Sequence, residues 1–465
     1  MNFIIISGII IILLYFIGLT NNKNNHSYNA EWGQSFEHLS RFNQGFAITG
    51  SKALTKNISH ENVFLCGPTG SGKSSIAIIS SAASLAKGKS SIIFNDVSNE
   101  VFERTSTFLA EKGYQIMRLD FSNSKKSETF NPLLECESIS DIQKVATLIL
   151  RNSIGSAKGD PFWDQSAIML ISLFARYLVF HTEPEFRTLQ NVLRLIETFA
   201  VNGEAIDKLF VNTGDSELLS SYKATIVVGD KTLQSVIITA RTSLSLFCDP
   251  EVCRTTATNS IDFSLLRKQP VALYVCNPLK DLIYFKPLSA LFFQSLFNHV
   301  LSRIPGKDER SIFFVIDEAA TMKFPDLSIT ISNIRKFKAG ILLCMQDEMA
   351  LISQYGQAEA HQIKTNCGTQ VYLKGQPLHT AKELSQILGK HTHVNDKGVE
   401  KIRELFTPDE IRMCDDTIIL INNKAPLKCR TVPYYKNMWL SRLTSLSPYQ
   451  LPEKEITDPP LIPLI

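Results

Sequence analysis

The sequence of 465 residues predicts an α/β fold built on a parallel sheet, with an inserted helical segment and an N-terminal membrane-spanning helix. Three observations support this fold class. Short apolar runs alternate with segments of helical spacing on both sides of the middle of the chain, which is the pattern of a parallel α/β sheet. Residues 138–225 have helical spacing and almost no strand signal. The first twenty residues contain a long run without charge.

The uncharged run Phe3–Leu19 predicts a membrane anchor. In a helix, a run of this length spans roughly 25 Å, enough for a thin bilayer. A cleaved signal peptide is the alternative, but no basic segment precedes the run and no small-x-small site follows it. The first basic residue is Lys23, so the positive-inside tendency places the rest of the chain in the cytoplasm. We expect a single-pass anchor over residues 1–20 and a polar linker over residues 21–35.

A glycine-rich loop follows the strand-like run Val63–Leu65 and opens into a helix. Gly67-x-x-x-x-Gly72-Lys73-Ser74 is the phosphate-binding loop signature. Its glycines let backbone N–H groups approach phosphate oxygens, and the helix directs its positive end at the same anion. Lys73 would reach the β- and γ-phosphates, and Ser74 would hold Mg²⁺. We therefore predict a site for ATP and Mg²⁺. The residues of the predicted cradle are Gly67, Pro68, Thr69, Gly70, Ser71, Gly72, Lys73, Ser74 and Ser75.

The remaining strands are expected wherever short apolar runs recur. Residues Glu100–Lys112 have helical spacing and lie between the expected strands Ser91–Asn95 and Tyr114–Leu119. This gives the strand–helix–strand alternation of a parallel sheet. Two runs near the end of the chain flank a short polar turn and predict a hairpin. The expected strands are Ser91–Asn95, Tyr114–Leu119, Val271–Cys276, Ser311–Ile316, Ile341–Met345, Val371–Leu373, and the hairpin pair Thr417–Ile421 and Leu427–Thr431.

The inserted segment predicts an all-helical unit of about 80 residues, because apolar residues recur there at intervals of three and four. Phe162 and Trp163 stand at the start of its second helix. The simpler interpretation of these aromatic residues is core or capping packing. A surface role in contacting DNA or a protein partner is the alternative.

A second nucleotide-site signature follows the run Ser311–Ile316, which ends in Asp317 and Glu318. A buried parallel strand delivers such residues to the carboxyl edge of the sheet, where ligands bind. Asp317 would contact the Mg²⁺ shell, and Glu318 would polarise the attacking water. Gln346 ends the next strand and either senses the γ-phosphate or is an ordinary polar residue at a strand end. Both interpretations of Gln346 stay open.

Composition restricts the partners and the compartment. The 48 basic and 45 acidic residues give a net charge of +3, so any DNA-binding surface must be a local patch. The nine cysteines include no CxxC pair, which excludes a zinc site or a disulfide framework and predicts reduced, mostly buried thiols. Residues 438–465 are rich in Pro and Ser and predict a tail with little core of its own.

Several stretches carry a resemblance to a known family. In order, these are GPTGSGKSS, SETFNPL, DPFWDQSA, FFVIDEAATMKFPDL and IRKFKAGILLCMQDEM. From about Phe36 to Tyr435 the sequence resembles the type IV coupling proteins, the VirD4/TraG family of conjugation ATPases. The resemblance implies a RecA-like P-loop NTPase core formed by residues 36–137 and 226–437, with the all-helical domain inserted between the two parts. It also implies a homohexamer at the cytoplasmic face of the bacterial inner membrane.

The resemblance also implies a function. Proteins of this kind recruit a relaxase attached to single-stranded DNA, as part of a relaxosome, and pass it to a type IV secretion channel using ATP hydrolysis. Lys73, Ser74, Asp317 and Glu318 match the family's nucleotide site. Gln346 matches its γ-phosphate sensor.

Arg335 resembles an arginine finger that reaches the ATP of a neighbouring subunit. A solvated helix charge is the alternative for this residue. Lys336 and Lys338 are candidates for DNA contact, although neighbouring cations more often form a solvated face.

The chain departs from the family at its N-terminus, because members commonly have two N-terminal spans and this sequence shows one. Two other functions stay open. A double-stranded DNA pump similar to FtsK or HerA would share the fold and both nucleotide signatures. A membrane-anchored docking receptor for protein effectors would use ATP binding for assembly.

Overall fold

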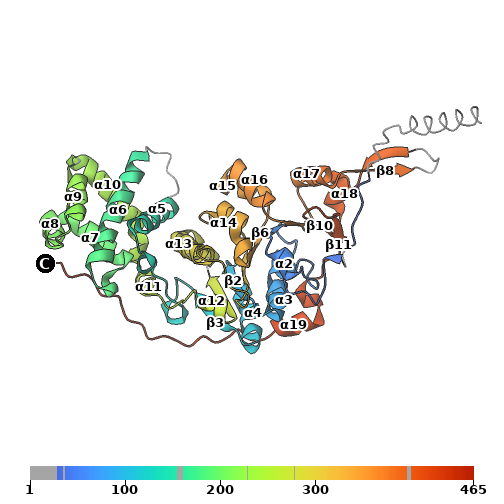
Figure 1. The fold of residues 1–465 in the computed structure, drawn as a ribbon, viewed down its shortest axis with the longest axis horizontal. Helices are drawn as coiled ribbons and strands as arrows, with labels where there is room; N and C mark the ends of the chain where they lie inside the picture. The colour runs from blue at the N-terminus through green and yellow to red at the C-terminus, as the bar shows by residue number, and fades with distance from the viewer. Residues whose placement is uncertain are drawn as a thin grey trace, which may run out of the picture.

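The computed structural model describes residues 29–34, 37–153, 161–227, 229–276, 278–394 and 400–464 (Figure 1). The predicted anchor over residues 1–20 lies outside the described residues, as does most of the predicted linker. Within the described residues, no helix combines the length and apolar character that crossing a membrane requires.

A nine-stranded mixed sheet forms the centre of the molecule, in the order β11-β10-β7-β1-β6-β5-β2-β4-β3. Seven strands run parallel, while β10 is antiparallel to β7 and to β11. All nine lie within two residues of the predicted strands, which confirms the α/β class and the hairpin. The strands are β1 Val63–Cys66, β2 Ser91–Asp96, β3 Gln115–Leu119, β4 Val271–Cys276, β5 Ile312–Ile316, β6 Ala339–Met345, β7 Thr369–Tyr372, β10 Thr417–Ile421 and β11 Leu427–Cys429.

Both faces of the sheet are covered by helices, as the nearly all-apolar central strands require. In β1, Val63 and Leu65 pack on one face while Phe64 and Cys66 pack on the other. All four residues are fully buried. The first face carries α3 Ile79–Lys87 and α4 Glu100–Glu111, and the second carries α13 Leu282–Leu301, α14 Leu327–Asn333 and α16 Gln357–Thr365.

The predicted helical segment forms a lobe at one end of the molecule (Figure 1). Helix α10 lies beyond the predicted end at residue 225, and it packs against α6 and α7. Helix α5 packs on α13, so the apolar core of the lobe is continuous with that of one sheet face. The helices are α5 Ile139–Ser153, α6 Pro161–His181, α7 Leu189–Val201, α8 Gly203–Asn212, α9 Ser216–Ile226 and α10 Asp230–Leu244.

The shorter elements connect these layers. One antiparallel pair, β8 Lys390–Val394 with β9 Glu400–Glu404, was not predicted, because its residues are mostly polar and show no apolar alternation. The remaining α-helices are α2 Lys56–Ser59, α11 Pro250–Thr255, α12 Leu265–Lys268, α15 Glu348–Tyr355, α17 Leu378–Leu388, α18 Pro408–Met413 and α19 Met438–Thr444. Single 3₁₀ turns are η3 Ser124–Lys126, η4 Pro132–Glu135, η5 Pro184–Phe186, η6 Ser245–Cys248, η7 Leu279–Asp281, η8 Ile334–Phe337 and η9 Tyr434–Lys436.

The C-terminal tail is packed more closely than its composition predicted. Helix α19 packs against α4, and the chain then runs along the molecule to the helical lobe (Figure 1). There the Asn191 amide donates to the Pro460 carbonyl at 3.1 Å and accepts from the Ile462 N–H at 3.0 Å. Ile462 itself is 4% exposed and belongs to the main apolar core. The tail therefore ties the helical lobe to the sheet.

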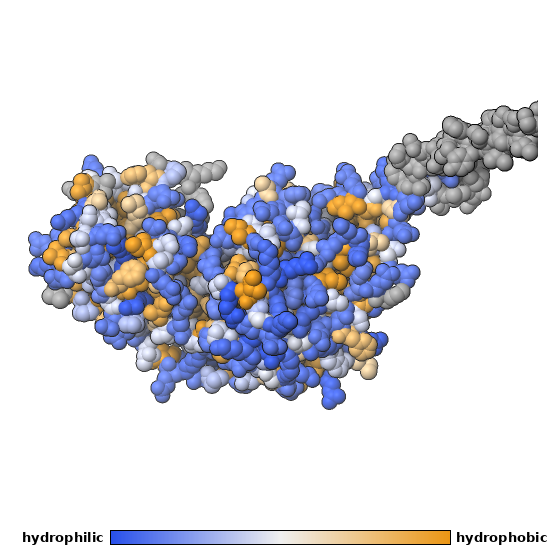
Figure 2. Space-filling view, in the orientation of Figure 1, coloured by the Kyte–Doolittle hydropathy of each residue, from blue (hydrophilic) through white to orange (hydrophobic). Residues whose placement is uncertain are grey.

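The surface is mainly hydrophilic and most thiols are buried. Figure 2 shows mainly hydrophilic side chains, with small groups of apolar ones scattered over the helical lobe and over the rest of the face shown. Seven of the nine cysteines are buried and none forms a disulfide, which confirms the prediction of buried thiols outside any disulfide framework. Trp163 is partly buried against the core and meets Phe162 edge-on, so Trp163 packs at the start of α6. Phe162 is 46% exposed, and a surface role for it stays a prediction.

Candidate nucleotide-binding site

The loop after β1 has the backbone that a phosphate cradle needs. Gly70 and Gly72 have φ of +80° and +96°, a left-handed conformation that glycine adopts readily. A Cβ at Gly67 would lie 2.5 Å from Ser71 Oγ, so the loop is closed to a larger residue there. The chain then enters a π-helical turn, η2 Ser74–Ile78, which continues into α3. The Ser71 hydroxyl is buried without a hydrogen-bond partner among the described residues, so the cradle has an unused donor.

Four neighbouring strands bring the predicted site residues together. The strands β1, β6, β5 and β2 are adjacent in the sheet, and their carboxyl ends meet at one edge. A cleft of about 520 Å³ opens there. Its lining includes Lys73, Ser74, Asp317, Glu318 and Gln346, so the two signatures and the glutamine form one site.

Lys73 is held by the loop and by Glu318. Its ammonium donates to the Gly67 carbonyl at 2.8 Å and lies 3.9 Å from Glu318 Oε2. Glu318 has φ of +54°, and its carbonyl accepts from both the N–H and the hydroxyl of Thr321. A residue with a Cβ is strained in this conformation. The two hydrogen bonds from Thr321 hold the Glu318 backbone in it.

Glu100, Asp317 and Glu318 line the cleft, and Asp96 is buried beside them. Burial, together with the nearby charges of Asp96 and Glu318, raises the pKa of Asp317 to about 7. Burial also raises the pKa of Asp96 to about 6, although a hydrogen bond from the Phe102 N–H at 2.8 Å partly opposes the rise. Asp96 Oδ1 has no hydrogen-bond partner among the described residues. Carboxylate and hydroxyl oxygens around uncompensated negative charge are the donor set that Mg²⁺ prefers, so the residues fit this ion.

Gln346 joins the strand end to the phosphate loop. Its side-chain oxygen accepts a hydrogen bond from Thr69 Oγ1 at 3.2 Å. This contact places the amide beside the cradle. The sensor role itself stays a prediction.

Arg335 lies away from this cleft. It is in η8, directly before β6, and its guanidinium pairs with Glu61 at 2.9 Å, directly before β1. It therefore occupies the amino edge of the sheet, opposite the phosphate loop of its own chain. Its role as a finger toward a neighbouring subunit stays a prediction. The Lys338 ammonium donates to the carbonyls of Gly306 and Lys307, so it is used in a structural contact.

Sequence reasoning missed several residues of the cleft. Ser98 and Glu100 follow β2, and the predicted strand position could have placed them at this edge. Tyr435 also lines the cleft, although 58% of its surface is exposed. It comes from a distant part of the chain, at the end of the stretch that resembles the family, and no local pattern there indicated a place in the cleft.

The glycine-rich loop, the Asp-Glu pair and the mixed sheet define a P-loop nucleotide-binding protein with an α/β core. Residues 22–458 match the family model for type IV secretory system conjugative DNA transfer, and the chain belongs to this family. The predicted resemblance to the type IV coupling proteins is thereby confirmed.

The comparisons with individual proteins agree with this family. The chain is 28% identical over 429 residues to Protein VirD4 of Rhizobium radiobacter, covering 83% of this chain and 59% of that protein. It is 25% identical over 518 residues to Protein VirD4 of Rhizobium rhizogenes, covering 97% of this chain and 72% of that protein. This chain thus spans between about three fifths and three quarters of the length of these relatives.

Solved structures of the plasmid coupling protein TrwB have the same fold. The form in complex with sulphate has a TM-score of 0.69 at 16% identity, over 87% of this chain and 95% of that one. The complex with ADP and Mg²⁺ has a TM-score of 0.68 at 16% identity, over 89% of this chain and 92% of that one. At this level of identity, the comparison establishes the α/β core.

Proposed function

We propose that this protein is an ATPase that couples a relaxosome, with its relaxase on single-stranded DNA, to a type IV secretion channel during bacterial conjugation. The observation that carries the proposal is the meeting of Lys73, Asp317 and Glu318 in one cleft of a chain that belongs to the conjugative DNA transfer family. Solved complexes of TrwB with ADP and Mg²⁺ and with the ATP analogue ADPNP support ATP and Mg²⁺ as the cofactors.

The residues of the cleft divide the chemistry among them. Backbone N–H groups of the loop and the Lys73 ammonium bind the phosphates, and Ser74 with Asp317 supplies oxygen ligands for the metal. Bound Mg²⁺ neutralises charge on the phosphates as the γ-phosphate leaves. Glu318 orients and deprotonates the attacking water. Gln346, tied to the loop through Thr69, reports whether the γ-phosphate is in place.

We further propose a single-pass anchor in the inner membrane, with the ATPase domain in the cytoplasm. The support is the uncharged run before residue 20 together with the first basic residue at Lys23. The active assembly in this proposal is a homohexamer, in which Arg335 of one subunit completes the site of the next.

Steady-state ATP hydrolysis by the purified chain, with and without single- and double-stranded DNA, tests this function. We expect turnover that single-stranded DNA stimulates and that both Lys73→Ala and Glu318→Gln abolish. A strong preference for duplex DNA would instead favour a pump similar to FtsK or HerA. Tight ATP binding without turnover under any DNA condition would overturn the motor and favour a docking receptor for protein effectors.

A further inference from the structure

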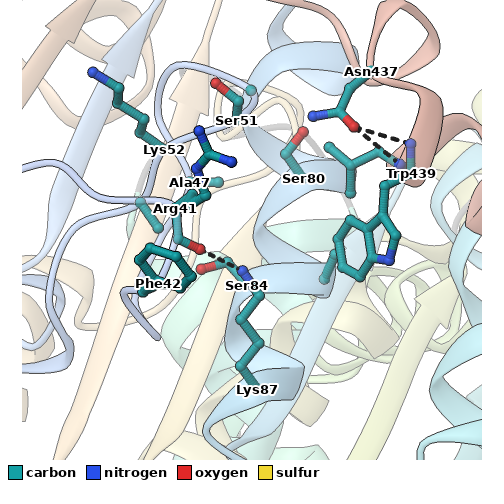
Figure 3. Close-up of a pocket in the computed structure, with 14 residues that line it drawn as sticks. Arg41, Phe42, Ala47, Ser51, Lys52, Ser80, Ser84, Lys87, Asn437 and Trp439 are labelled. Atoms are coloured by element: carbon teal, nitrogen blue, oxygen red, sulfur yellow. Dashed lines mark hydrogen bonds between the residues drawn. The ribbon is translucent and has the colours of Figure 1, made fainter.

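A second cleft, of about 540 Å³, lies along α3 beyond the nucleotide site (Figure 3). Figure 3 shows Phe42 on one side and Trp439 on the other, with Arg41 and Ser80 between them. Both aromatic rings are open to solvent, because Phe42 is 80% exposed and Trp439 is 51% exposed. The polar and aromatic lining residues are Arg41, Phe42, Ser51, Lys52, Ser80, Ser84, Lys87, Asn437 and Trp439.

The cleft carries uncompensated positive charge. Arg41, Lys52 and Lys87 all line it, and no Asp or Glu is among the described residues that do so. The Lys87 ammonium donates to the Arg41 carbonyl at 2.6 Å and lies 5.7 Å from the centre of the Trp439 ring. Burial lowers the pKa of Lys87, and no carboxylate opposes this effect. An anion in the cleft would supply the missing counter-charge.

One buried hydroxyl at the wall of the cleft has no partner. Ser80 is 2% exposed, and its Oγ makes no hydrogen bond among the described residues. The Oγ atom is enclosed by the protein, so Ser80 belongs to the wall of the cleft and is not itself a contact for a ligand.

We propose that this cleft binds single-stranded nucleic acid, with its phosphates held by Arg41 and Lys52 and its bases stacked on Phe42 and Trp439. Cations that follow the backbone, combined with aromatic rings that stack on bases, are the general means of holding a single strand. A duplex offers phosphates but hides the faces of its bases, and an acidic peptide does not present a ring beside every negative charge. A single strand uses both the charge and the two rings.

The cleft is distinct from the ATP site. The two clefts share no lining residue. Ser80 lies seven positions after Lys73, which is about 10 Å along a helix. A free nucleotide has the same phosphate and base chemistry as a unit of a strand. Two exposed rings on either side of an open cleft favour consecutive bases of a strand, and the experiment separates the two sources.

Fluorescence anisotropy of a labelled oligothymidylate of about 20 residues, titrated with the full-length chain in the absence of ATP, tests the proposal. Trp439→Ala and Phe42→Ala should each raise Kd at least about fivefold, since one base stack contributes that much. Arg41→Ala and Lys52→Ala should each reduce the slope of log K against log salt by about 0.7. The matched controls Met438→Ala and Lys436→Ala replace exposed neighbours outside the cleft and should leave Kd and the slope unchanged.

Two readouts exclude trivial explanations. Each variant should keep the wild-type melting temperature and the wild-type affinity for an ATP analogue. Phe42→Ala in particular should not alter the core, because the Phe42 side chain is exposed. Unchanged oligonucleotide binding in both aromatic variants would overturn the proposal. Thymidine monophosphate that competes at the same concentration as the strand would also overturn it and assign the cleft to a free nucleotide. Because ATP is absent, failure here and failure of the proposed ATPase are separate results.

Discussion

The Lys73 ammonium lies 3.9 Å from the Glu318 carboxylate, across the cleft between the phosphate loop and the end of β5. The residue that would bind phosphate is thus beside the residue that would activate water. A triphosphate in the cleft competes with Glu318 for Lys73, and this competition connects nucleotide binding to the position of the base.

Glu318→Gln should separate binding from hydrolysis. It removes the negative charge and the base while keeping the shape, so ATP should bind at least as tightly as in the wild type. Hydrolysis should fall by about 10²- to 10⁴-fold, the usual contribution of a general base. Binding of a fluorescent ATP analogue and single-turnover phosphate release measure the two effects. Lys73→Ala is the matched contrast and should lose binding itself. Hydrolysis within tenfold of wild type in Glu318→Gln would assign the base to another residue.

Glu318→Gly should stabilise the protein while it abolishes turnover. Glu318 has φ of +54°, where a residue with a Cβ pays about 1–2 kcal/mol and glycine does not. The greater entropy of glycine in the unfolded chain offsets part of this gain, so we expect the free energy of unfolding to rise by about 1 kcal/mol. Denaturant unfolding measures it, with Glu318→Gln as the control that keeps the Cβ. Equal stability of the two variants would contradict stored strain at this position.

Tyr435→Ala should weaken nucleotide binding without changing the chemical step. Tyr435 lines the cleft but belongs to neither the phosphate loop nor the Asp-Glu pair, so we expect its ring to contact the base or sugar of the nucleotide. Loss of one aromatic contact is worth about 1 kcal/mol, which corresponds to about a fivefold rise in KM. Steady-state kinetics at saturating ATP should show an unchanged kcat. Tyr435→Phe keeps the ring and should behave as wild type, and a lowered kcat in the alanine variant would contradict a binding role.

The sheet, and the meeting of Lys73 and Asp317 at one edge of it, could be predicted from the sequence for a physical reason. Strands buried on two faces must be short and apolar, so runs such as Val271–Cys276 stand out. Asp317 follows such a run, and parallel topology alone brings it to the edge that holds Lys73. Helix α10 also carried a usable signal, because Val236, Ala240 and Leu244 continue the helical spacing past residue 225.

The remaining features depend on contacts between distant or exposed segments. Tyr435 and Trp439 line two different clefts, yet both are exposed and follow no apolar period. The ion pair of Arg335 with Glu61 joins residues 274 positions apart, and although both precede predicted strands, no local pattern predicts that these two side chains pair. Such features follow from tertiary packing, which a reading of local periodicity does not contain.

Asn191→Ala should release the end of the tail from the helical lobe. The fully buried Asn191 side chain bonds the carbonyls of Phe186 and Pro460 and the N–H of Ile462, and each bond contributes about 1 kcal/mol. We expect about 2–3 kcal/mol of destabilisation, with proteolysis of the tail before the rest of the chain. Arg241→Ala alters an exposed ion pair in the same lobe and serves as the control, with a loss below about 1 kcal/mol. A tail as resistant to protease as in wild type would show that Asn191 does not secure it.

His60 should make the protein less stable in acid. The imidazole is stacked on Phe313, and its Nε2 lies 3.1 Å from Ser311 Oγ. Burial, together with the positive charges of Lys56, Arg267, Lys338 and Arg335, lowers the pKa of His60 to about 4. The unfolded chain therefore binds a proton on this ring near pH 6.5, while the folded chain does not until about pH 4.

The contribution of neutral His60 to the free energy of unfolding is complete above pH 6.5, the pKa in the unfolded chain. It is lost as the pH falls from 6.5 to about 4, the pKa in the folded protein. The loss should reach about 2 kcal/mol between pH 7 and pH 5. Many carboxylates titrate nearby, so the quantity to measure is the difference in unfolding free energy between wild type and His60→Asn. That difference should shift against the wild type as the pH falls, because asparagine takes up no proton in either state. A difference that stays constant from pH 7 to pH 4 would mean that His60 is protonated as easily in the folded protein as in the unfolded chain.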